Sequence, residues 1–209
     1  MRYGLIGWPL GHSISPQLRL AGVEYDLRPL PEAEFEAFMA ARDFAAVNVT
    51  IPYKRRVLPY CAQLTPAARR CGSVNLLIKG RDGTLTGDNT DLAGLEFLLR
   101  QNGWVLTGQT VVILGSGGTG HTAKAAAEEL GAAEIATVSR TGELNYENLA
   151  KRFGKREFYL INTTPVGMAP QSGVSPLDLR QFPRCKGVAD AIYNPLRTRL
   201  CQQAAALGI

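Results

Sequence analysis

Apolar and polar residues along this chain of 209 residues follow two repeating patterns, and these patterns predict strands that alternate with helices. Phe35, Phe38 and Met39 form an i, i+3, i+4 apolar stripe, which predicts a helix over 31–43. The nearly unbroken apolar run in 109–115 is typical of a strand that is buried on both faces of a parallel sheet. The two patterns together favour layers of helices packed on sheets.

The remaining elements follow from the same reasoning. We expect strands over 2–7, 24–30, 44–52, 133–140, 157–165 and 187–195, helices over 92–103 and 145–153, a glycine-rich turn leading into a helix over 116–131, and a hairpin over 75–91 with its turn at 80–83. Repeated βα units predict a doubly wound α/β structure. We place a boundary between two domains near residues 91–102.

Composition narrows the class of protein. Hydrophobic residues make up 45% and charged residues 20%, as in ordinary globular proteins. No apolar run approaches the roughly 20 residues of a membrane span. The N-terminal stretch reaches Gly, Pro and His too soon for a signal peptide. We therefore expect a cytoplasmic protein that does not contact a membrane.

Charge and cysteine content indicate which ligands to expect. The net charge of +5 is modest and the basic residues are spread out, so we expect small anionic ligands rather than a nucleic acid. The four cysteines form no CxxC pair, and neither of the two histidines lies near a cysteine. We therefore expect reduced thiols and no metal site.

A glycine-rich segment follows the buried strand over 109–115 and opens the next helix. It fits the spacing G-x-G-x-x-G and consists of Gly115, Ser116, Gly117, Gly118, Thr119 and Gly120. Glycine allows a tight turn and lets the backbone approach a pyrophosphate, whose charge is favoured at a helix N-terminus. The alternative is a plain glycine-rich turn between strand and helix.

The end of the next strand bears on the identity of the nucleotide. NAD enzymes usually place a carboxylate there to bind the ribose 2′-hydroxyl, whereas this chain has Ser139, Arg140 and Thr141. A guanidinium is suited to a 2′-phosphate, so the sequence favours NADP. Glu143 could repel that phosphate, which leaves NAD as an alternative, and Arg140 could instead be a solvated strand-end residue.

Short polar side chains gather where strands and turns of the first half end. Ser13, Ser15, Thr50, Asn75 and Asn89 offer neutral hydrogen bonds, and Lys54 and Asp91 offer opposite charges. Each one alone is explained by turn chemistry. These residues lie in four segments, GWPLGHSISPQ, NVTIPYK, GSVN and GDNTD, ahead of the dinucleotide domain. Together the four segments favour a site for a small polyhydroxylated acid.

The segments that carry these residues resemble the shikimate dehydrogenase family. The matching pieces are GHSISP, NVTIPYK, GSVN, GDNTD, GSGGTG, SRT, INTTPVGM and DAIYNPLRT, in the family's order, and they cover most of residues 4–198. The resemblance implies an N-terminal α/β domain that binds shikimate, with a mixed, mainly parallel sheet, over 1–91. It also implies a Rossmann-like domain that binds NADP over 92–198. The implied activity is the reversible reduction of 3-dehydroshikimate to shikimate in aromatic amino acid biosynthesis, by a monomer or homodimer.

The resemblance also implies roles for individual residues. Lys54 and Asp91 would be catalytic; Ser13, Ser15, Thr50, Asn75 and Tyr193 would bind the substrate; and 115–120, 139–141, Thr163, Pro165 and Met168 would hold the cofactor. Reducing a ketone places negative charge on its oxygen, and a lysine aimed at that oxygen stabilises the charge and supplies a proton. We expect Arg55 and Arg56 to be solvated helix residues instead.

The chain departs from the family in three places. Only QLRLAGV separates Pro16 from the next strand, where the family has a full helix, and a family glutamine would follow Ile209. We expect both segments to belong to the full-length protein, including C-terminal helices of the first domain that follow residue 199. The second basic residue that often follows SRT is absent.

Two other functions remain open on the sequence. One is an NAD-dependent quinate or quinate/shikimate dehydrogenase of the same family. The other is a relative that senses substrate or cofactor without turnover, against which Lys54 and Asp91 argue.

Overall fold

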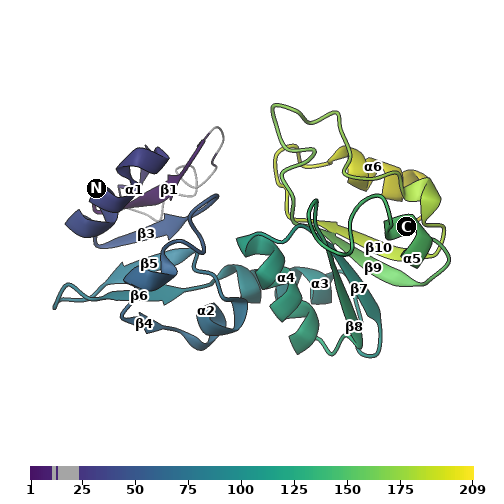
Figure 1. Cartoon of the computed structure of the whole chain (residues 1–209), viewed down its shortest axis with the longest axis horizontal. Helices are drawn as coiled ribbons and strands as arrows, with labels where there is room; N and C mark the ends of the chain where they lie inside the picture. The colour runs from purple at the N-terminus through teal and green to yellow at the C-terminus, as the bar shows by residue number, and fades with distance from the viewer. Residues whose placement is uncertain (11–12, 14–23) are drawn as a thin grey trace. The chain divides into compact units, whose positions relative to one another are not determined.

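The structure, a computed structural model, describes residues 1–10, 13 and 24–209. The chain divides into two compact units, Met1–Asp91 and Leu92–Ile209 (Figure 1). Each unit has its own sheet and its own hydrophobic core.

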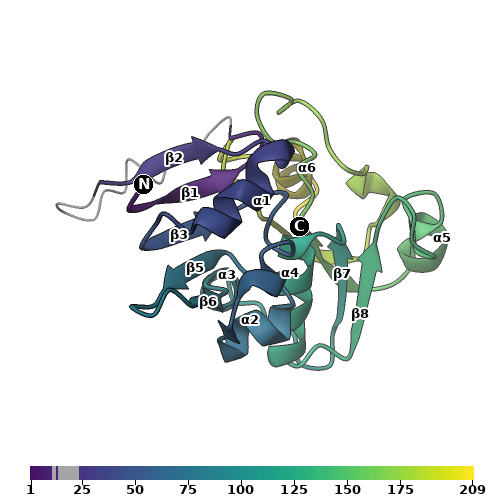
Figure 2. The ribbon, with the colours of Figure 1, turned by 60° about the vertical axis from the view of Figure 1, so that its left-hand side comes forward.

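The first unit is a six-stranded sheet with helices and turns between its strands (Figure 2). Its elements are β1 (Tyr3–Gly7), β2 (Asp26–Pro29), α1 (Glu32–Ala41), β3 (Ala46–Val49), the short helix η2 (Leu58–Tyr60), β4 (Gln63–Leu64), α2 (Pro66–Cys71), β5 (Leu76–Lys79) and β6 (Leu85–Asp88). The strand order is β2-β1-β3-β5-β6-β4. Strand β5 runs antiparallel to β3 and β6, and the other pairs are parallel, so the sheet is mixed and mainly parallel as expected.

One apolar cluster packs α1 on this sheet. Phe35 and Met39 of the predicted helical stripe are fully buried, and they meet strand residues such as Val47 and Leu77. Burial of apolar area of this kind is the main stabilising contribution to folding, at about 25 cal/mol per Å². The core therefore fixes β3, and Thr50 and Lys54 follow the end of this strand.

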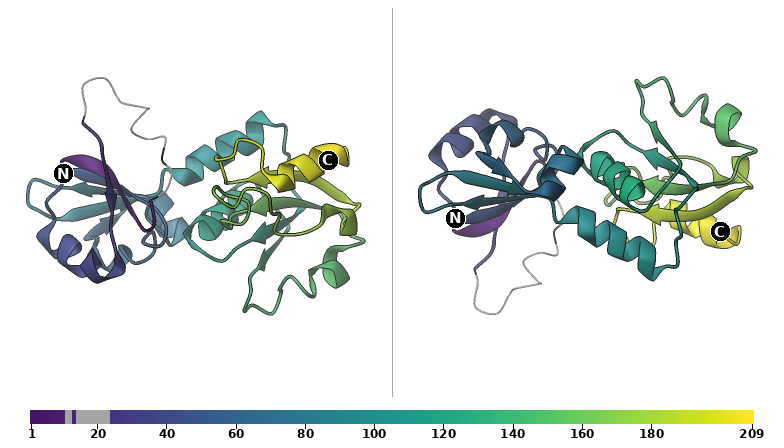
Figure 3. Two further views of the ribbon diagram at one scale, coloured as in Figure 1. Left: turned by 90° about the horizontal axis from the view of Figure 1, so that it is seen from above. Right: turned by 90° about the horizontal axis from the view of Figure 1, so that it is seen from below.

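The second unit is a four-stranded parallel sheet in the order β10-β9-β7-β8. Its elements are α3 (Asp91–Gln101), β7 (Thr110–Leu114), α4 (Gly118–Glu129), β8 (Glu134–Val138), α5 (Leu149–Phe153), β9 (Phe158–Asn162), the short helix η3 (Leu179–Gln181), β10 (Cys185–Asp190) and α6 (Arg199–Ala206). Figure 3 shows α3 as the helix by which the chain passes from the first sheet to the second.

Helices cover both faces of the second sheet. One core cluster joins strand residues to α5 and α6, and a second cluster joins strand residues to α3 and α4. Val111, Val112, Ile113 and Leu114 are therefore all completely buried, as the apolar run predicted. This is the Rossmann-like arrangement that the sequence indicated.

The predicted elements are present, with shorter ends in several places. The strand expected over 44–52 ends at Val49, the one expected over 187–195 ends at Asp190, and the helix expected over 145–153 starts at Leu149. The glycine at the hairpin turn, Gly83, has φ +81, and Gly103, the last residue of the predicted helix, has φ +72.

Five elements were not predicted from the spacing of apolar residues: β4, α2, α6 and the short helices η2 and η3. Strand β4 has only two residues, too few for a periodic signal. The helices α2 and α6 each follow a capping threonine, Thr65 or Thr198. The threonine hydroxyl accepts a hydrogen bond from the backbone N–H three residues later. Leu200 and Ala204 of α6 pack in the core of the second unit. No helix of the described residues is long and apolar enough to cross a membrane.

Candidate active site

The turn after β3 holds Lys54 in place through its buried neighbour. Tyr53 is fully buried, stacks on Phe35 with 4.5 Å between ring centroids, and donates a hydrogen bond of 2.5 Å to the Leu30 carbonyl. The carbonyl of Lys54 accepts a hydrogen bond of 2.7 Å from the N–H of Val74. The backbone at Lys54 is therefore fixed on both sides, and its side chain extends away from the core.

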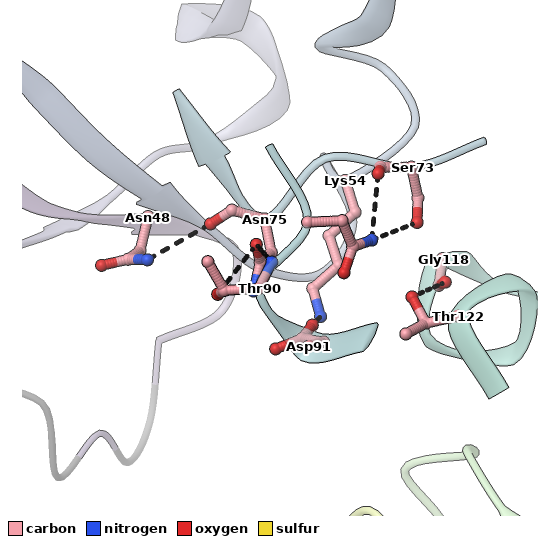
Figure 4. A network of polar contacts seen from close by, with 9 residues as sticks. Asn48, Lys54, Ser73, Asn75, Thr90, Asp91, Gly118 and Thr122 are labelled. Atoms are coloured by element: carbon pink, nitrogen blue, oxygen red, sulfur yellow. Dashed lines mark hydrogen bonds and ion pairs between the residues drawn. The ribbon is translucent and has the colours of Figure 1, made fainter. Parts of the chain in front are cut away.

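Lys54 and Asp91 form an ion pair. The distance between Lys54 Nζ and Asp91 Oδ2 is 2.6 Å, and the side chains are 14% and 38% exposed (Figure 4). Asp91 is the first residue of α3, where the partial positive charge of the helix N-terminus favours a carboxylate. The pair brings a proton donor and a carboxylate together at the end of a strand, with both groups accessible to solvent.

Asn75 fixes the residue that precedes Asp91. Its Oδ1 accepts a hydrogen bond of 2.9 Å from Thr90 N–H, and its Nδ2 donates one of 3.0 Å to Thr90 Oγ1 (Figure 4). Asn75 is almost fully buried. Its amide therefore orients the start of α3, and one N–H of its Nδ2 group remains beyond the bond to Thr90.

Asn89 and Ser73 hold the same loop from the other side. Asn89 Nδ2 donates hydrogen bonds of 3.0 Å to both the carbonyl and the hydroxyl oxygen of Ser73, and both residues are buried. Asn89 is thus a structural clamp for the loop 88–91. A buried amide without such partners would cost on the order of 1–3 kcal/mol, so the clamp is strongly specified.

Thr50 lies where β3 ends and is half buried. Its methyl group packs so closely over Gly7 that a Cβ at position 7 would lie 2.4 Å from Thr50 Cγ2. Within the described residues no hydrogen bond of the Thr50 hydroxyl is found, so that group is available to a ligand. Ser13 is half buried, and Ser15 lies outside the described residues.

The glycine-rich turn of the second unit combines two crowded glycines with one open glycine. Gly115 has φ +107, and a Cβ at Gly120 would lie 2.2 Å from the Gly115 carbonyl oxygen. At Gly117, the residue before α4, a Cβ would meet nothing within 4 Å. The first and last glycines are thus required by the fold. The middle one leaves room at a helix N-terminus, as a pyrophosphate needs, so these residues fit a dinucleotide.

The end of β8 presents Arg140 to solvent. Arg140 and Thr141 are exposed, and Ser139 is half buried. Burial raises the pKa of Tyr146, and the positive charge of Arg140 partly opposes that rise, so Arg140 lies near this ring. Within the described chain Arg140 forms no ion pair, so its guanidinium can serve a phosphate.

The loops after β9 and β10 contain the other predicted cofactor and substrate residues. Thr163 donates a hydrogen bond of 2.7 Å from Oγ1 to the Leu114 carbonyl, which ties the loop after β9 to the end of β7. Met168 is 40% exposed and Tyr193 is 47% exposed. Because β7, β9 and β10 are parallel, their carboxyl ends share one edge of the sheet, so these loops and the glycine-rich turn lie at the same edge.

Comparison with known proteins shows the family to which the chain belongs. The family model described as "Shikimate dehydrogenase substrate binding domain" matches residues 5–77. The shikimate dehydrogenase (NADP(+)) of Paramagnetospirillum magneticum is 35% identical over 232 residues, which cover 98% of this chain and 83% of that protein. The chain belongs to the shikimate dehydrogenase family.

Solved structures of the family agree with this result. The shikimate 5-dehydrogenase of Thermus thermophilus, in complex with NADP(H) and shikimate, has a TM-score of 0.80 and 32% identity, and the match covers 100% of this chain and 85% of that one. The Listeria monocytogenes enzyme, in complex with shikimate and NAD, has a TM-score of 0.71 and 27% identity over 100% and 84% of the chains. The resemblance predicted from sequence motifs is confirmed.

Within this family framework, the structure brings together Lys54, Asp91 and Asn75 in the first unit, with Thr50 on the same strand-end turn. In the second unit it brings the glycine-rich turn together with the loops that carry Thr163, Pro165, Met168 and Tyr193. The roles of these residues, and of Ser13, Ser15 and 139–141, stay predictions.

The expectation for Arg55 and Arg56 was wrong in part, because residues 51–57 form turns and not a helix. Arg56 forms an ion pair of 2.8 Å with Glu32 and lies over the Phe35 ring, 4.5 Å from its centroid. It fastens the turn of Lys54 to α1. The apolar stripe of α1 indicated Phe35 as a core residue, but no sequence signal paired it with Arg56.

Sequence reasoning also missed Asn162 and Asp190. They are the last residues of β9 and β10 and are hydrogen bonded to each other. Both lie in motifs that carried the family resemblance, and that was the available signal, because the predicted strands ran on to residues 165 and 195.

Proposed function

We propose that this protein catalyses the reversible NADP-dependent reduction of 3-dehydroshikimate to shikimate. The observation that carries the proposal is the ion pair of 2.6 Å between Lys54 and Asp91 at the carboxyl end of β3. A family member that lacked turnover would have no need of a solvent-accessible lysine that is fixed by a carboxylate.

In this mechanism Lys54 acts on the ketone oxygen of the substrate. NADPH supplies a hydride to the carbonyl carbon. The π electrons of the C=O bond move to the oxygen, and the Lys54 ammonium stabilises that charge and transfers a proton to it. Lys54 then recovers a proton from water. Asp91 keeps the ammonium in position through their ion pair of 2.6 Å. In the oxidation of shikimate each step runs in reverse.

Neutral side chains are proposed to bind the substrate. The proposed substrate-binding residues are Ser13, Ser15, Thr50, Asn75 and Tyr193. Thr50 offers a hydroxyl and Asn75 an N–H near Lys54, and both suit the ring hydroxyl groups of shikimate. A ligand held by neutral hydrogen-bond donors and acceptors is positioned without disturbing the Lys54–Asp91 charge pair.

The second unit is proposed to bind NADP. The open space at Gly117 next to the N-terminus of α4 supports a pyrophosphate there, and the exposed Arg140 supports a 2′-phosphate. Thr163, Pro165 and Met168 are proposed to line the nicotinamide side. The prediction of a monomer or homodimer in the cytoplasm stays a prediction.

Steady-state rates at 340 nm test the function directly. The purified protein is assayed with shikimate or quinate, each with NADP⁺ or NAD⁺. We expect the highest kcat/KM with shikimate and NADP⁺. A higher value with quinate and NAD⁺ would favour the quinate-oxidising relatives. Binding of shikimate without turnover of any pair would identify a non-catalytic sensor and reject the proposal.

A further inference from the structure

Asn162 and Asp190 join the ends of two neighbouring strands. They are register partners in the parallel pair β9–β10, which lie side by side in Figure 1. Asn162 is completely buried, and its Nδ2 donates a hydrogen bond of 3.0 Å to Asp190 Oδ1. The two side chains therefore form a bridge at the carboxyl edge of the sheet.

The bridge holds the first residues of the loop after β9. Asn162 Oδ1 accepts hydrogen bonds from the N–H of Thr164, at 3.1 Å, and from its hydroxyl, at 2.7 Å. The Asn162 carbonyl accepts a hydrogen bond of 2.9 Å from the N–H of Ala191. Asn162 is thus bonded to Asp190 and Thr164 through its side-chain amide and to Ala191 through its backbone carbonyl.

Asp190 holds both ends of the loop after β10. Its Oδ1 accepts a hydrogen bond of 3.1 Å from the N–H of Ile192, and its Oδ2 accepts one of 2.7 Å from the Thr198 hydroxyl. Thr198 is almost fully buried and also caps α6, because its hydroxyl accepts a hydrogen bond from Cys201 N–H. The loop 191–198 is consequently closed through a single carboxylate.

The two loops are also bonded to each other at their middle, since Ala169 N–H donates a hydrogen bond of 3.0 Å to the Asn194 carbonyl. Tyr193 lies between the two fixed points of its loop, Ile192 and Asn194. The position of the Tyr193 backbone therefore depends on the hydrogen bond between Ile192 and Asp190 and on the hydrogen bond between Asn194 and Ala169.

A carboxylate at this half-buried position has an energetic cost, because burial disfavours its charged form. Burial raises the pKa of Asp190, and hydrogen bonds from Thr198, Ile192 and Asn162 oppose that rise. All three donors are neutral, and no ion pair with Asp190 is found within the described residues. An ionised acceptor forms stronger hydrogen bonds than a neutral one, so this residue type gives the loops a rigidity that an amide would not.

We propose that Asp190 is a positioning residue, whose carboxylate fixes the loops 163–168 and 191–198 in the conformation that presents Thr163, Met168 and Tyr193 to the reactants. The inference rests on the proposed function for the roles of those three residues. It adds a residue that acts through them and contacts neither substrate nor cofactor.

Asp190→Asn tests the proposal, because it keeps the shape and replaces one acceptor oxygen with an NH₂ group that faces a donor. We expect kcat with saturating shikimate and NADP⁺ to fall about tenfold, equivalent to roughly 1.4 kcal/mol. Hydrogen exchange of the amides of Thr164, Ala169 and Ile192, measured without ligand, should become faster. The dissociation constant for NADP⁺, measured by fluorescence titration, should rise by a smaller factor than kcat falls, because 115–120 and 139–141 are untouched and only the loop on the nicotinamide side is loosened.

Asp178→Asn is the matched control. Asp178 lies in the same unit and caps η3 through the N–H of Arg180, with no hydrogen bond to either loop. It should leave kcat and the exchange of both loops unchanged. A second pair gives rescue: Thr198→Ser keeps the hydroxyl donor and should keep kcat, whereas Thr198→Val removes it and should behave like Asp190→Asn.

Three results would overturn the proposal. Wild-type kcat in Asp190→Asn would show that the carboxylate is not needed. Unchanged exchange in the loops would show that it does not hold them. Loss of NADP⁺ binding together with a large fall in Tm would assign Asp190 to folding alone. If the wild-type protein binds NADP⁺ but turns over neither shikimate nor quinate, the proposed function fails, and loop exchange still decides whether Asp190 holds the loops.

Discussion

In the first unit the strand ends carry charged and amide side chains, whereas in the second unit the turn after β7 carries glycines with almost no side chains. Lys54 and Asp91 place two full charges 2.6 Å apart. The turn 115–120 instead exposes backbone at a helix N-terminus. A ketone that gains charge needs a group able to transfer a proton, and only a side chain provides one. A pyrophosphate needs several N–H donors at once, which a bare backbone provides.

The two units also differ in how they hold these groups. The loop 88–91 is held to neighbouring residues in two places, since the Asn75 side chain accepts a hydrogen bond from Thr90 N–H and the Asn89 side chain donates one to the Ser73 hydroxyl. The loops of the second unit are held by Asn162 and Asp190 at the strand ends themselves. In both units buried or half-buried polar residues such as Asn89, Asn162 and Asp190 hold the loops, and more exposed residues such as Asp91 and Arg140 are proposed to face the ligands.

The comparison predicts its largest effect at Lys54. Lys54→Ala should reduce kcat by about 10²- to 10⁴-fold with a much smaller change in the KM for shikimate, because the contact is made mainly in the transition state. Steady-state kinetics at 340 nm provide the measurement. Lys79→Ala is the control, since Lys79 donates a hydrogen bond to the Arg42 carbonyl and serves only structure. Wild-type turnover in Lys54→Ala would show that the positive charge of Lys54 is not needed for the reaction.

Arg140 is an exception to the bare backbone of the second unit, because it is a side chain proposed to recognise phosphate. Arg140→Ala should raise the KM for NADP⁺ about ten- to a hundredfold, since a hydrogen bond to a charged group contributes roughly 1.5–3 kcal/mol. The KM for NAD⁺ should stay nearly the same. Arg184→Ala is the matched control, because Arg184 precedes β10 at the opposite edge of the sheet and pairs with Glu157. Equal changes for both cofactors would show that Arg140 does not read the 2′-phosphate.

Gly117 and Gly120 separate cofactor binding from folding. Gly117→Ala adds a Cβ in open space, so Tm should hold while NADP⁺ binding weakens by about tenfold, or roughly 1.4 kcal/mol. Gly120→Ala places a Cβ against the Gly115 carbonyl. This variant should lower the free energy of unfolding by about 1–3 kcal/mol, so its Tm should fall as well. Calorimetry and fluorescence titration measure the two quantities. Unchanged NADP⁺ binding in Gly117→Ala would remove the assignment of this turn to the pyrophosphate.

The smallest expected effect is at the opposite edge of the second sheet. A hydrogen bond from Arg156 lowers the pKa of Glu134, the first residue of β8. A lowered pKa means that this contribution to stability is present above the unfolded pKa and is lost as the pH falls through the folded pKa. Glu134→Gln should therefore lower the urea midpoint slightly at pH 7 and not at pH 3, with unchanged kcat. Glu147→Gln, at an exposed glutamate without an ion pair among the described residues, should shift neither. A pH-independent effect would contradict this assignment.

The sequence predicted the periodic elements and the motif residues better than it predicted the residues that hold them. The apolar stripe of α1 and the apolar run of β7 form buried faces, and the spacing of apolar residues along the chain is enough to predict them. The partners of Asn75, Asn162 and Asp190 come from other strands, and local spacing does not encode which strands become neighbours. Strand β4 and the capped helices α2 and α6 were missed for a related reason, because they are short and owe their stability to tertiary packing.

A double-mutant cycle tests the central claim, that Lys54 and Asp91 act as one unit in the chemical step. The kcat for shikimate oxidation is measured for Lys54→Ala, Asp91→Asn, the double variant and the wild-type protein. We expect the double variant to lose much less than the product of the two single losses, with a coupling of about 0.5–3 kcal/mol. Losses that multiply, or an Asp91→Asn variant with wild-type kcat, would contradict it.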